Sequence, residues 1–286
     1  MNMRVVAEDY RLGDALSPQR ARGELKLALV NDGGAGTRLA DLYQAGCLKI
    51  RFPRAQDVGT FEAVTLNLSG GIAGGDHLDT HIHLGANAQA LIAALAAEKV
   101  YGARVGESAR VETHIHLEAG ASLDYLPQET ILFDNLWLER NLTVTMAADA
   151  RYLGVECLVF GRAAMGEVLR HGELRDRIRI TRAGQLLFLD QTRLSGDLAA
   201  QLSGKALAGG AGAFANIVCV APDAGDQLNA IREAIRHGGG EGAASAFSGM
   251  VLARLLAKNA ASLREGVVKI LEICRKGRAL PRVWQS

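Results

Sequence analysis

Apolar and polar positions alternate in many short runs between residues 22 and 200, with the period of two that a β-strand imposes. In the first run, 22–30, the apolar positions include Leu25, Leu27 and Leu29. Further runs of this kind span 47–52, 61–68, 79–84, 109–117, 137–146, 150–160, 173–180 and 186–194. Glycine, asparagine and aspartate separate many of these runs, so the sequence predicts a mainly β architecture of short strands.

One pentapeptide, Thr-His-Ile-His-Leu, occurs at 80–84 and again, letter for letter, at 113–117. In each copy the isoleucine and the leucine face one side of a strand, and the two histidines face the other. A turn of small residues and a second apolar run follow each copy. Repeated units of this kind bury one face on the next unit, so we expect a stack of similar β-layers.

The C-terminal part of the chain has a different pattern. Residues 226–237 and 247–273 carry helical spacing, and the longer stretch has an apolar stripe at i, i+3 and i+4. That stripe consists of Leu252, Leu255, Leu256, Leu263, Val267, Ile270 and Leu271. The Gly/Ala-rich stretch 204–215 fits either a mobile loop or a hairpin. We expect one domain over 1–286, with an N-terminal segment 1–21, a β-rich body 22–222 and a helical part 223–286.

Composition excludes several classes of protein. Lys and Arg number 32 against 31 Asp and Glu, so bulk charge indicates neither a nucleic-acid nor an anionic-membrane partner. No stretch reaches the roughly 18 apolar residues that a membrane-spanning helix needs. The widely spaced Cys47, Cys157, Cys219 and Cys274 form no Cys-x-x-Cys pair. We therefore expect reduced, mostly buried thiols in a cytoplasmic protein.

The two His-x-His pairs invite a metal interpretation, because alternate residues on one strand face can chelate and imidazole suits nickel, copper and zinc. If the repeats stack, His81, His83, His114 and His116 lie near one another, with Asp79 on the same strand face. No cysteine or carboxylate joins them at ligand spacing in the sequence. We therefore expect outward strand positions with no essential metal role.

Two loop motifs carry polar side chains. Ser-Gly-Gly-Ile-Ala-Gly-Gly-Asp at 69–76 lacks the helix start of a phosphate loop, so we interpret it as a tight double turn. Asp76 then either caps this turn or points into an internal cavity. Leu-Pro-Gln-Glu-Thr-Ile-Leu-Phe at 126–133 places Gln128 and Glu129 after a proline bend. If buried, they form either a structural network or the lining of a polar passage.

No catalytic motif is present: the chain has no Gly-x-Ser-x-Gly, no His-Glu-x-x-His and no cysteine beside a local histidine. A β-helical hydrolase or lyase acting on a polar polymer would use acids on one face of stacked strands. Such enzymes usually display aromatic residues for sugar stacking. Aromatics make up only 5% of this chain, which counts against that alternative.

Five segments, in this order, resemble the urease accessory protein family called UreD or UreH. They are 70–76, 98–101 (Glu-Lys-Val-Tyr), 126–133, 161–167 (Gly-Arg-Ala-Ala-Met-Gly-Glu) and 280–284 (Leu-Pro-Arg-Val-Trp). The resemblance spans roughly residue 23 to the end. It implies a flattened β-helix-like fold with a few helices near the C-terminus, and a role that is not enzymatic.

The resemblance also implies partners and a cargo. Family members join UreF-like and UreG-like accessory proteins and bind urease apoprotein, and UreG receives help from the metallochaperone UreE. Nickel is expected to pass through an internal passage towards the urease active site, with no tightly bound cofactor. Scattered oxygen ligands suit such a passage better than a tight cage. In the resembling family both Asp76 and Glu167 are acidic, so our hypothesis is that they are transient nickel ligands, with Gln128, Glu129 and Thr130 as further lining. The alternative is that both acids only cap turns.

The last expectation concerns a partner interface. The apolar stripe carries more apolar residues than one core-facing stripe of a helix requires. We therefore expect part of it, with the terminal segment 278–284, to dock on the UreF-like partner. The residues assigned to this interface are Leu252, Leu255, Leu256, Val267, Leu271 and Trp284.

Overall fold

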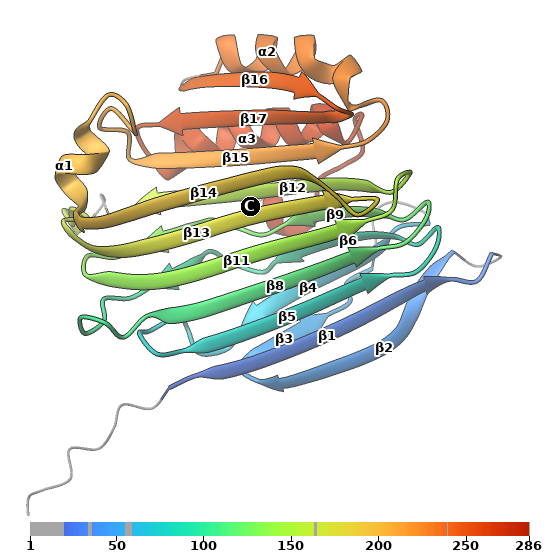
Figure 1. Cartoon of the computed structure of the whole chain (residues 1–286), viewed down its shortest axis with the longest axis horizontal. Helices are drawn as coiled ribbons and strands as arrows, with labels where there is room; N and C mark the ends of the chain where they lie inside the picture. The colour runs from blue at the N-terminus through green and yellow to red at the C-terminus, as the bar shows by residue number, and fades with distance from the viewer. Residues whose placement is uncertain (1–19, 34–35, 55–58, 163–164, 239, 286) are drawn as a thin grey trace, which may run out of the picture.

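A computed structural model describes residues 20–33, 36–54, 59–162, 165–238 and 240–285. Over these residues the chain is a β-solenoid of about four turns with three α-helices, mostly in the C-terminal half. Figure 1 shows the strands side by side from β2 at one end to β16 at the other. The flattened, mainly β stack expected from the sequence is therefore confirmed.

The first sheet has seven strands in the order β14-β13-β11-β8-β5-β1-β2. The five inner strands run parallel to one another, whereas β2 and β14 pair antiparallel at the two edges. The strands are β1 (Arg22–Asn31), β2 (Thr37–Gly46), β5 (His77–Leu84), β8 (Ala109–Leu117), β11 (Leu136–Met146), β13 (His171–Arg182) and β14 (Gln185–Asp197).

The second sheet has the order β16-β17-β15-β12-β9-β6-β4-β3, with β7 and β10 branching from it. In Figure 1 its strands from β3 to β12 lie behind the first sheet, and β15, β17 and β16 continue it above β14. Its strands are β3 (Leu48–Arg51), β4 (Phe61–Asn67), β6 (Gln89–Ala94), β7 (Glu98–Val100), β9 (Ser122–Leu126), β10 (Thr130–Leu132), β12 (Arg151–Phe160), β15 (Ala213–Val220), β16 (Glu241–Phe247) and β17 (Met250–Ala257). The helices are α1 (Leu198–Ser203), α2 (Leu228–Arg236) and α3 (Ala260–Cys274), with short turns η2 (Ala224–Gln227) and η3 (Arg282–Trp284).

The two copies of the repeated pentapeptide lie on β5 and β8 and pair in perfect register. Thr80 lies opposite Thr113, His81 opposite His114 and Leu84 opposite Leu117. The alternation of the sequence decides which side chain faces inwards, because successive residues of a strand point to opposite faces of the sheet. The predicted stacking of the repeat is confirmed.

Two hydrophobic clusters hold the layers together. The first fills the space between the two sheets and includes Leu25, Ile82, Ile115 and Val144. The second includes Val251 and Ala253 of β17 together with Ile231 of α2 and Val267 and Ile270 of α3. Helices α2 and α3 therefore pack against one face of the C-terminal strands of the second sheet, while the first cluster joins the two sheets.

The prediction of helical spacing over 247–273 is wrong for its first part, because residues 250–257 form strand β17 and only 260–274 form α3. Leu252 and Leu256 pack on the first cluster, and Val251 and Leu255 belong to the second. Because β17 carries apolar residues on both of its faces, it lacks polar alternation, and its apolar run mimics one stripe of a helix. The helix expected at 226–237 is present as α2.

The Gly/Ala-rich stretch, for which loop and hairpin were both open, is a run of turns after α1 that leads into β15 at Ala213. Residues 1–19 of the expected N-terminal segment lie outside the described residues. The division into segments 1–21, 22–222 and 223–286 stays a prediction. Among the helices described, none is long and apolar enough to cross a membrane.

Candidate functional site: a carboxylate-lined cavity between the sheets

A cavity of about 440 Å³ lies between the two sheets. Its walls are largely apolar, with Leu25, Leu78 and Leu138 from the first sheet. Polar side chains border it as well: Thr80, Thr113, Gln128, Thr130, Asn67, Glu98, Tyr125, Arg140 and Glu156. Leu68 and Leu95 also border it and are 62% and 53% exposed, so the cavity reaches the surface beside them.

Arg140 organises the polar wall of this cavity. It lies on β11, directly opposite Asp176 of β13, and its Nε donates to both carboxylate oxygens at 3.1 Å. Its Nη2 donates to Glu156 Oε1 on β12 at 2.5 Å, and its Nη1 donates to Thr130 Oγ1 on β10 at 3.0 Å. One guanidinium thus joins strands of both sheets.

Two carboxylates share this single cation. Asp176 is 3% exposed, and the Glu156 side chain is 12% exposed. Burial, with the neighbouring charge of Asp176, raises the pKa of Glu156 to about 8, although Arg140 acts in the opposite direction. At neutral pH Glu156 therefore keeps its proton, which lowers the repulsion between the two acids that share Arg140.

The raised pKa predicts a pH effect on stability that Glu156→Gln removes. Unfolded glutamate releases its proton near 4.5, whereas folded Glu156 holds it up to about pH 8. Between these values the folded protein binds more protons than the unfolded chain, so a rise in pH lowers the free energy of unfolding. We expect the stability of Glu156→Gln relative to the parent to rise steadily over this range in urea titrations. A difference in stability that stays constant with pH would contradict the raised pKa of Glu156.

Glu98 of β7 is a second interior carboxylate with a different environment. Asn67 Nδ2 donates to its Oε2 at 3.2 Å, and no cationic side chain among residues 20–33, 36–54, 59–162, 165–238 and 240–285 forms an ion pair with it. Burial raises the pKa of Glu98, and the charge of nearby Asp76 adds to that rise. A carboxylate that lacks a cation in such a place would gain most from a passing metal ion.

The structure places Asp76 beside the cavity lining. Asp76 is 4% exposed, and its two carboxylate oxygens accept hydrogen bonds from the backbone N–H groups of Ala21 at 2.7 Å and Ala73 at 2.8 Å. It therefore fastens the glycine turn to the start of the described chain, and it does not border the cavity itself. Its role as a nickel ligand stays a prediction.

Glu167 is half-buried in a turn and does not border the cavity. Arg162 donates to it at 2.9 Å and 3.0 Å, and these hydrogen bonds lower the pKa of the Glu167 carboxyl. The Arg162 guanidinium also lies over the Phe133 ring, 4.2 Å from its centroid. The pair closes a turn at one side of the solenoid. The nickel role assigned to Glu167 also stays a prediction.

The segment after the proline bend forms a structural network and also borders the cavity. Gln128 donates to the Val283 carbonyl at 2.7 Å and accepts from Arg264 at 2.8 Å. Arg264 also pairs with Glu129 at 2.9 Å. Gln128 and Thr130 border the cavity, whereas Glu129 does not. Gln128 and Glu129 thus take part in a structural network, and the role of Gln128, Glu129 and Thr130 as the lining of a nickel passage stays a prediction.

The residues assigned to a partner interface lie mostly inside the chain. Val267 and Leu271 have no exposed surface, Leu255 is 6% exposed and Trp284 is 3% exposed. Leu252 and Leu256 are half-buried and pack on the cluster between the sheets. Their apolar character is thus explained by packing within the chain. Contact with a partner stays a prediction, and it would use the exposed residues around them.

Four residues of the site were not predicted from the sequence: Glu98, Arg140, Glu156 and Asp176. For Arg140 and Asp176, the alternation of inward and outward positions along their strands gives a signal. Arg140 continues the inward positions of Leu136 and Leu138, and Asp176 falls in phase with buried Leu174 and Ile178. A charged residue at an inward-facing position needs a partner of opposite charge. Which strand supplies that partner depends on register, which the sequence does not state.

Fold and site together define a β-solenoid protein with an interior cavity that offers carboxylate, amide and hydroxyl oxygens. The family model described as UreD urease accessory protein matches residues 21–285. Similar proteins include the "Urease accessory protein UreD" of Azorhizobium caulinodans, 42% identical over 93% of this chain and 97% of that protein. Those of Sinorhizobium medicae and Methylobacterium sp. are also 42% identical, over 94% of this chain and 98% and 96% of theirs.

The chain belongs to the UreD urease accessory protein family. Members of this family are non-catalytic assembly factors, so the alternative of a β-helical hydrolase or lyase is rejected. The resemblance carried by the five segments is confirmed.

Proposed function

We propose that the chain is a scaffold and nickel conduit for the maturation of urease. In this role it binds urease apoprotein together with UreF-like and UreG-like accessory proteins in the cytoplasm, and nickel is cargo rather than a resident cofactor. The observation that carries the proposal is the cavity between the sheets, which places interior carboxylates along a space that reaches the surface.

The chemistry of the lining suits transport better than storage. The oxygen donors that border the cavity come from Glu98, Glu156, Thr130 and the amides of Gln128 and Asn67. Oxygen ligands hold Ni²⁺ less tightly than thiolate and imidazole do, and a conduit must release the ion at its far end. Arg140 already neutralises much of the charge of Asp176 and Glu156, so Glu98 is the carboxylate best able to attract a cation.

The decisive test replaces Glu98 by glutamine in a strain that co-expresses the urease subunits and the other accessory proteins. Glutamine keeps the size of the side chain and a hydrogen bond with Asn67, but removes the negative charge that stabilises a cation in a poorly hydrated space. We expect the complex with urease to co-purify as before, and the nickel content of the matured urease to fall several-fold. Elemental analysis of purified urease measures this.

Glu24→Gln is the matched control, because it makes the same chemical change on β1 where the Glu24 carboxylate pairs with Lys26 at 2.7 Å and is 38% exposed. It should leave nickel loading unchanged. Normal loading in Glu98→Gln with an intact complex would refute the conduit while leaving the scaffold role. If the parent chain itself does not co-purify with urease, the scaffold role is refuted.

The same assay decides the roles assigned to Asp76 and Glu167. Asp76→Asn and Glu167→Gln lower nickel loading with the complex intact if the carboxylates are ligands. If they only fasten turns, the variants instead lose yield of folded protein, because backbone N–H groups or Arg162 lose their charged acceptor.

A further inference from the structure

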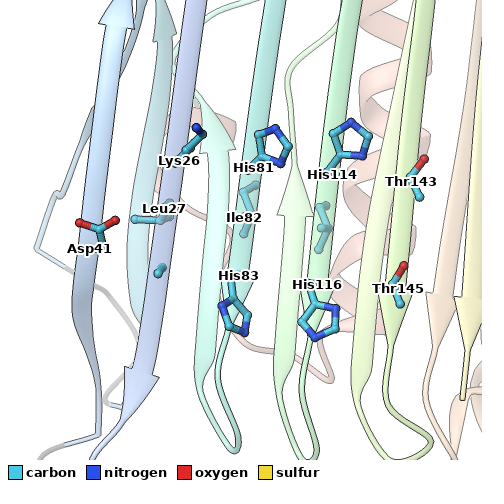
Figure 2. Close-up of a pocket in the computed structure, with 12 residues that line it drawn as sticks. Lys26, Leu27, Asp41, His81, Ile82, His83, His114, His116, Thr143 and Thr145 are labelled. Carbon is cyan, nitrogen blue, oxygen red and sulfur yellow. The ribbon is translucent and has the colours of Figure 1, made fainter.

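The outer face of the first sheet carries a ladder of histidines that the proposed conduit does not use. His81 and His83 on β5 lie opposite His114 and His116 on β8, and Figure 2 shows all four on the same face. The His81 and His114 rings stack with centroids 4.9 Å apart and an angle of 19° between their planes. The His83 and His116 rings meet edge to face at 5.2 Å.

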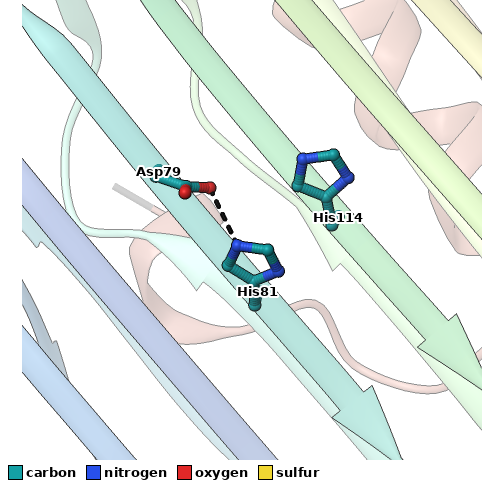
Figure 3. A group of neighbouring side chains, drawn as sticks. All are labelled: Asp79, His81 and His114. Atoms are coloured by element: carbon teal, nitrogen blue, oxygen red, sulfur yellow. Dashed lines mark ion pairs between the residues drawn. The ribbon is translucent and has the colours of Figure 1, made fainter.

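Two carboxylates complete this ladder. Asp79 Oδ1 lies 3.1 Å from His81 Nε2, as Figure 3 shows, and Glu118 Oε1 lies 2.9 Å from His83 Nε2. In each of the two groups, Asp79–His81–His114 and His83–His116–Glu118, the ligand atoms all lie within 4.8 Å of one another. Adjacent ligands around an ion bound at about 2.1 Å lie about 3 Å apart, so the measured pairs have the spacing that a metal requires.

We propose that this histidine ladder, the two groups Asp79–His81–His114 and His83–His116–Glu118, binds divalent transition-metal ions on the outside of the solenoid. Two imidazoles and one carboxylate form the donor set of each group. Imidazole suits nickel, copper and zinc, whereas magnesium and calcium prefer sets made only of oxygen. We expect affinity to follow copper above nickel and zinc, with manganese weaker.

The backbone holds the donors of the ladder in place before any ion arrives. Ile82 and Ile115, which separate the histidines, are each 2% exposed and anchor both strands in the core. Glu118 is oriented through its second oxygen, which accepts the Ala86 N–H at 3.0 Å and leaves Oε1 directed at His83. Only side-chain rotations are needed to close three donors on one ion, which limits the entropy lost on binding.

The setting of the ladder points to weak, exchangeable binding. The side chains of His81, Asp79, His83 and Glu118 are 36–48% exposed, so the remaining coordination positions of a bound ion face water. The two groups are one strand repeat apart, about 7 Å, and two bound dications repel each other at that distance. The second ion therefore binds more weakly than the first, and neither is trapped.

The ladder is also separate from the cavity. Thr80 and Thr113 of the same strands border the cavity on the inner face, so the sheet itself lies between the two places. Metal binding at the ladder therefore does not require that nickel passes through the interior. The sequence predicted outward histidines with no essential metal role, and the proposal adds that they bind metal. When they are removed, we still expect urease activation with nickel in excess to stay within a few-fold of the parent.

The test measures Ni²⁺ binding to the full-length chain at neutral pH by equilibrium dialysis and calorimetry. The ladder variant replaces His81, His83, His114 and His116 by glutamine, and we expect its nickel affinity to fall by at least about tenfold. The matched control replaces the other three histidines, His77, His171 and His237, and should bind as the parent does. Asp79→Asn and Glu118→Gln should each weaken one of two binding events.

Circular dichroism checks that each variant is folded. Parental nickel binding in the folded ladder variant, or lost binding in the control, would overturn the proposal, because nickel would then bind elsewhere. Equal binding of Mg²⁺ and Ni²⁺ would overturn it as well. This test measures nickel binding to the chain directly, whereas the conduit is tested by the nickel content of urease. A negative result for the ladder therefore leaves the result of Glu98→Gln unchanged, and the two proposals can fail independently.

Discussion

Replacing Arg140 by methionine is expected to lower the free energy of unfolding by about 3–5 kcal/mol, the usual cost of breaking a buried charge network by removing one partner. Methionine fills part of the space but leaves Asp176 and Glu156 without their cation. Thr130 Oγ1 loses its donor as well. Without Arg140 the pKa of Glu156 rises further, so the loss of stability is greater at pH 8 than at pH 6. Urea unfolding at the two pH values measures both effects.

Arg177→Met is the matched control, because Arg177 follows Asp176 on β13 but is exposed on the opposite face. It should change stability by less than about 0.5 kcal/mol. Adding Asp176→Asn and Glu156→Gln to Arg140→Met should restore part of the loss, because the uncompensated charges are then removed. If Arg140→Met proves no worse than Arg177→Met, the cluster contributes little to the fold.

Much of the β-body could be predicted from sequence because many of its strands face two different environments, as β1, β5 and β8 do. Residues 109–117 were expected as a strand with those bounds, and β8 has them. The repeated pentapeptide predicted stacking, and the register confirms it. In these strands the inner face meets the core and the outer face meets water, so alternation is visible. Edge strand β2 went unnoticed because its residues are half-buried or exposed throughout.

The candidate site could be predicted only in part, because its polar groups meet across the interior. Gln128 and Thr130 were found through a local motif, and both border the cavity. The Arg140 cluster joins β10, β11, β12 and β13, and its members are scattered over residues 130–176. Only the register of parallel strands brings Arg140 opposite Asp176. No local pattern contains that information, although a charge in an inward phase signals that a partner exists.

The alternation of β5 and β8 also explains how one strand pair serves two kinds of chemistry. Inward Thr80 and Thr113 contribute oxygen donors to the cavity, and the next residues, His81 and His114, stack on the outer face. A shift of the strand register by one residue would exchange the two faces. Duplication of the pentapeptide therefore duplicates an interior polar position and an exterior imidazole pair at the same time.

Trp284→Ala is expected to lower the free energy of unfolding by about 3–5 kcal/mol, as large-to-small changes of a buried aromatic residue do. The indole is 3% exposed, its Nε1–H donates to the Leu126 carbonyl at 3.0 Å, and Arg264 lies over its ring at 4.8 Å. The residue therefore fastens the C-terminal segment to β9. Trp284→Phe keeps most of the apolar contact but leaves the carbonyl without its donor, so we expect a smaller loss of about 1–3 kcal/mol.

These two variants also test whether Trp284 contacts the UreF-like partner. If the indole only packs within the chain, co-purification with the UreF-like partner falls in step with the folded fraction, and Trp284→Phe binds nearly as the parent does. Arg282→Ala, two residues away and exposed, is the control for stability and should change it by less than about 0.5 kcal/mol. Trp284→Phe could instead keep the stability of the parent and no longer bind the partner. That result would place the indole in the interface, because the lost contact would then be one with the partner and not one within the fold.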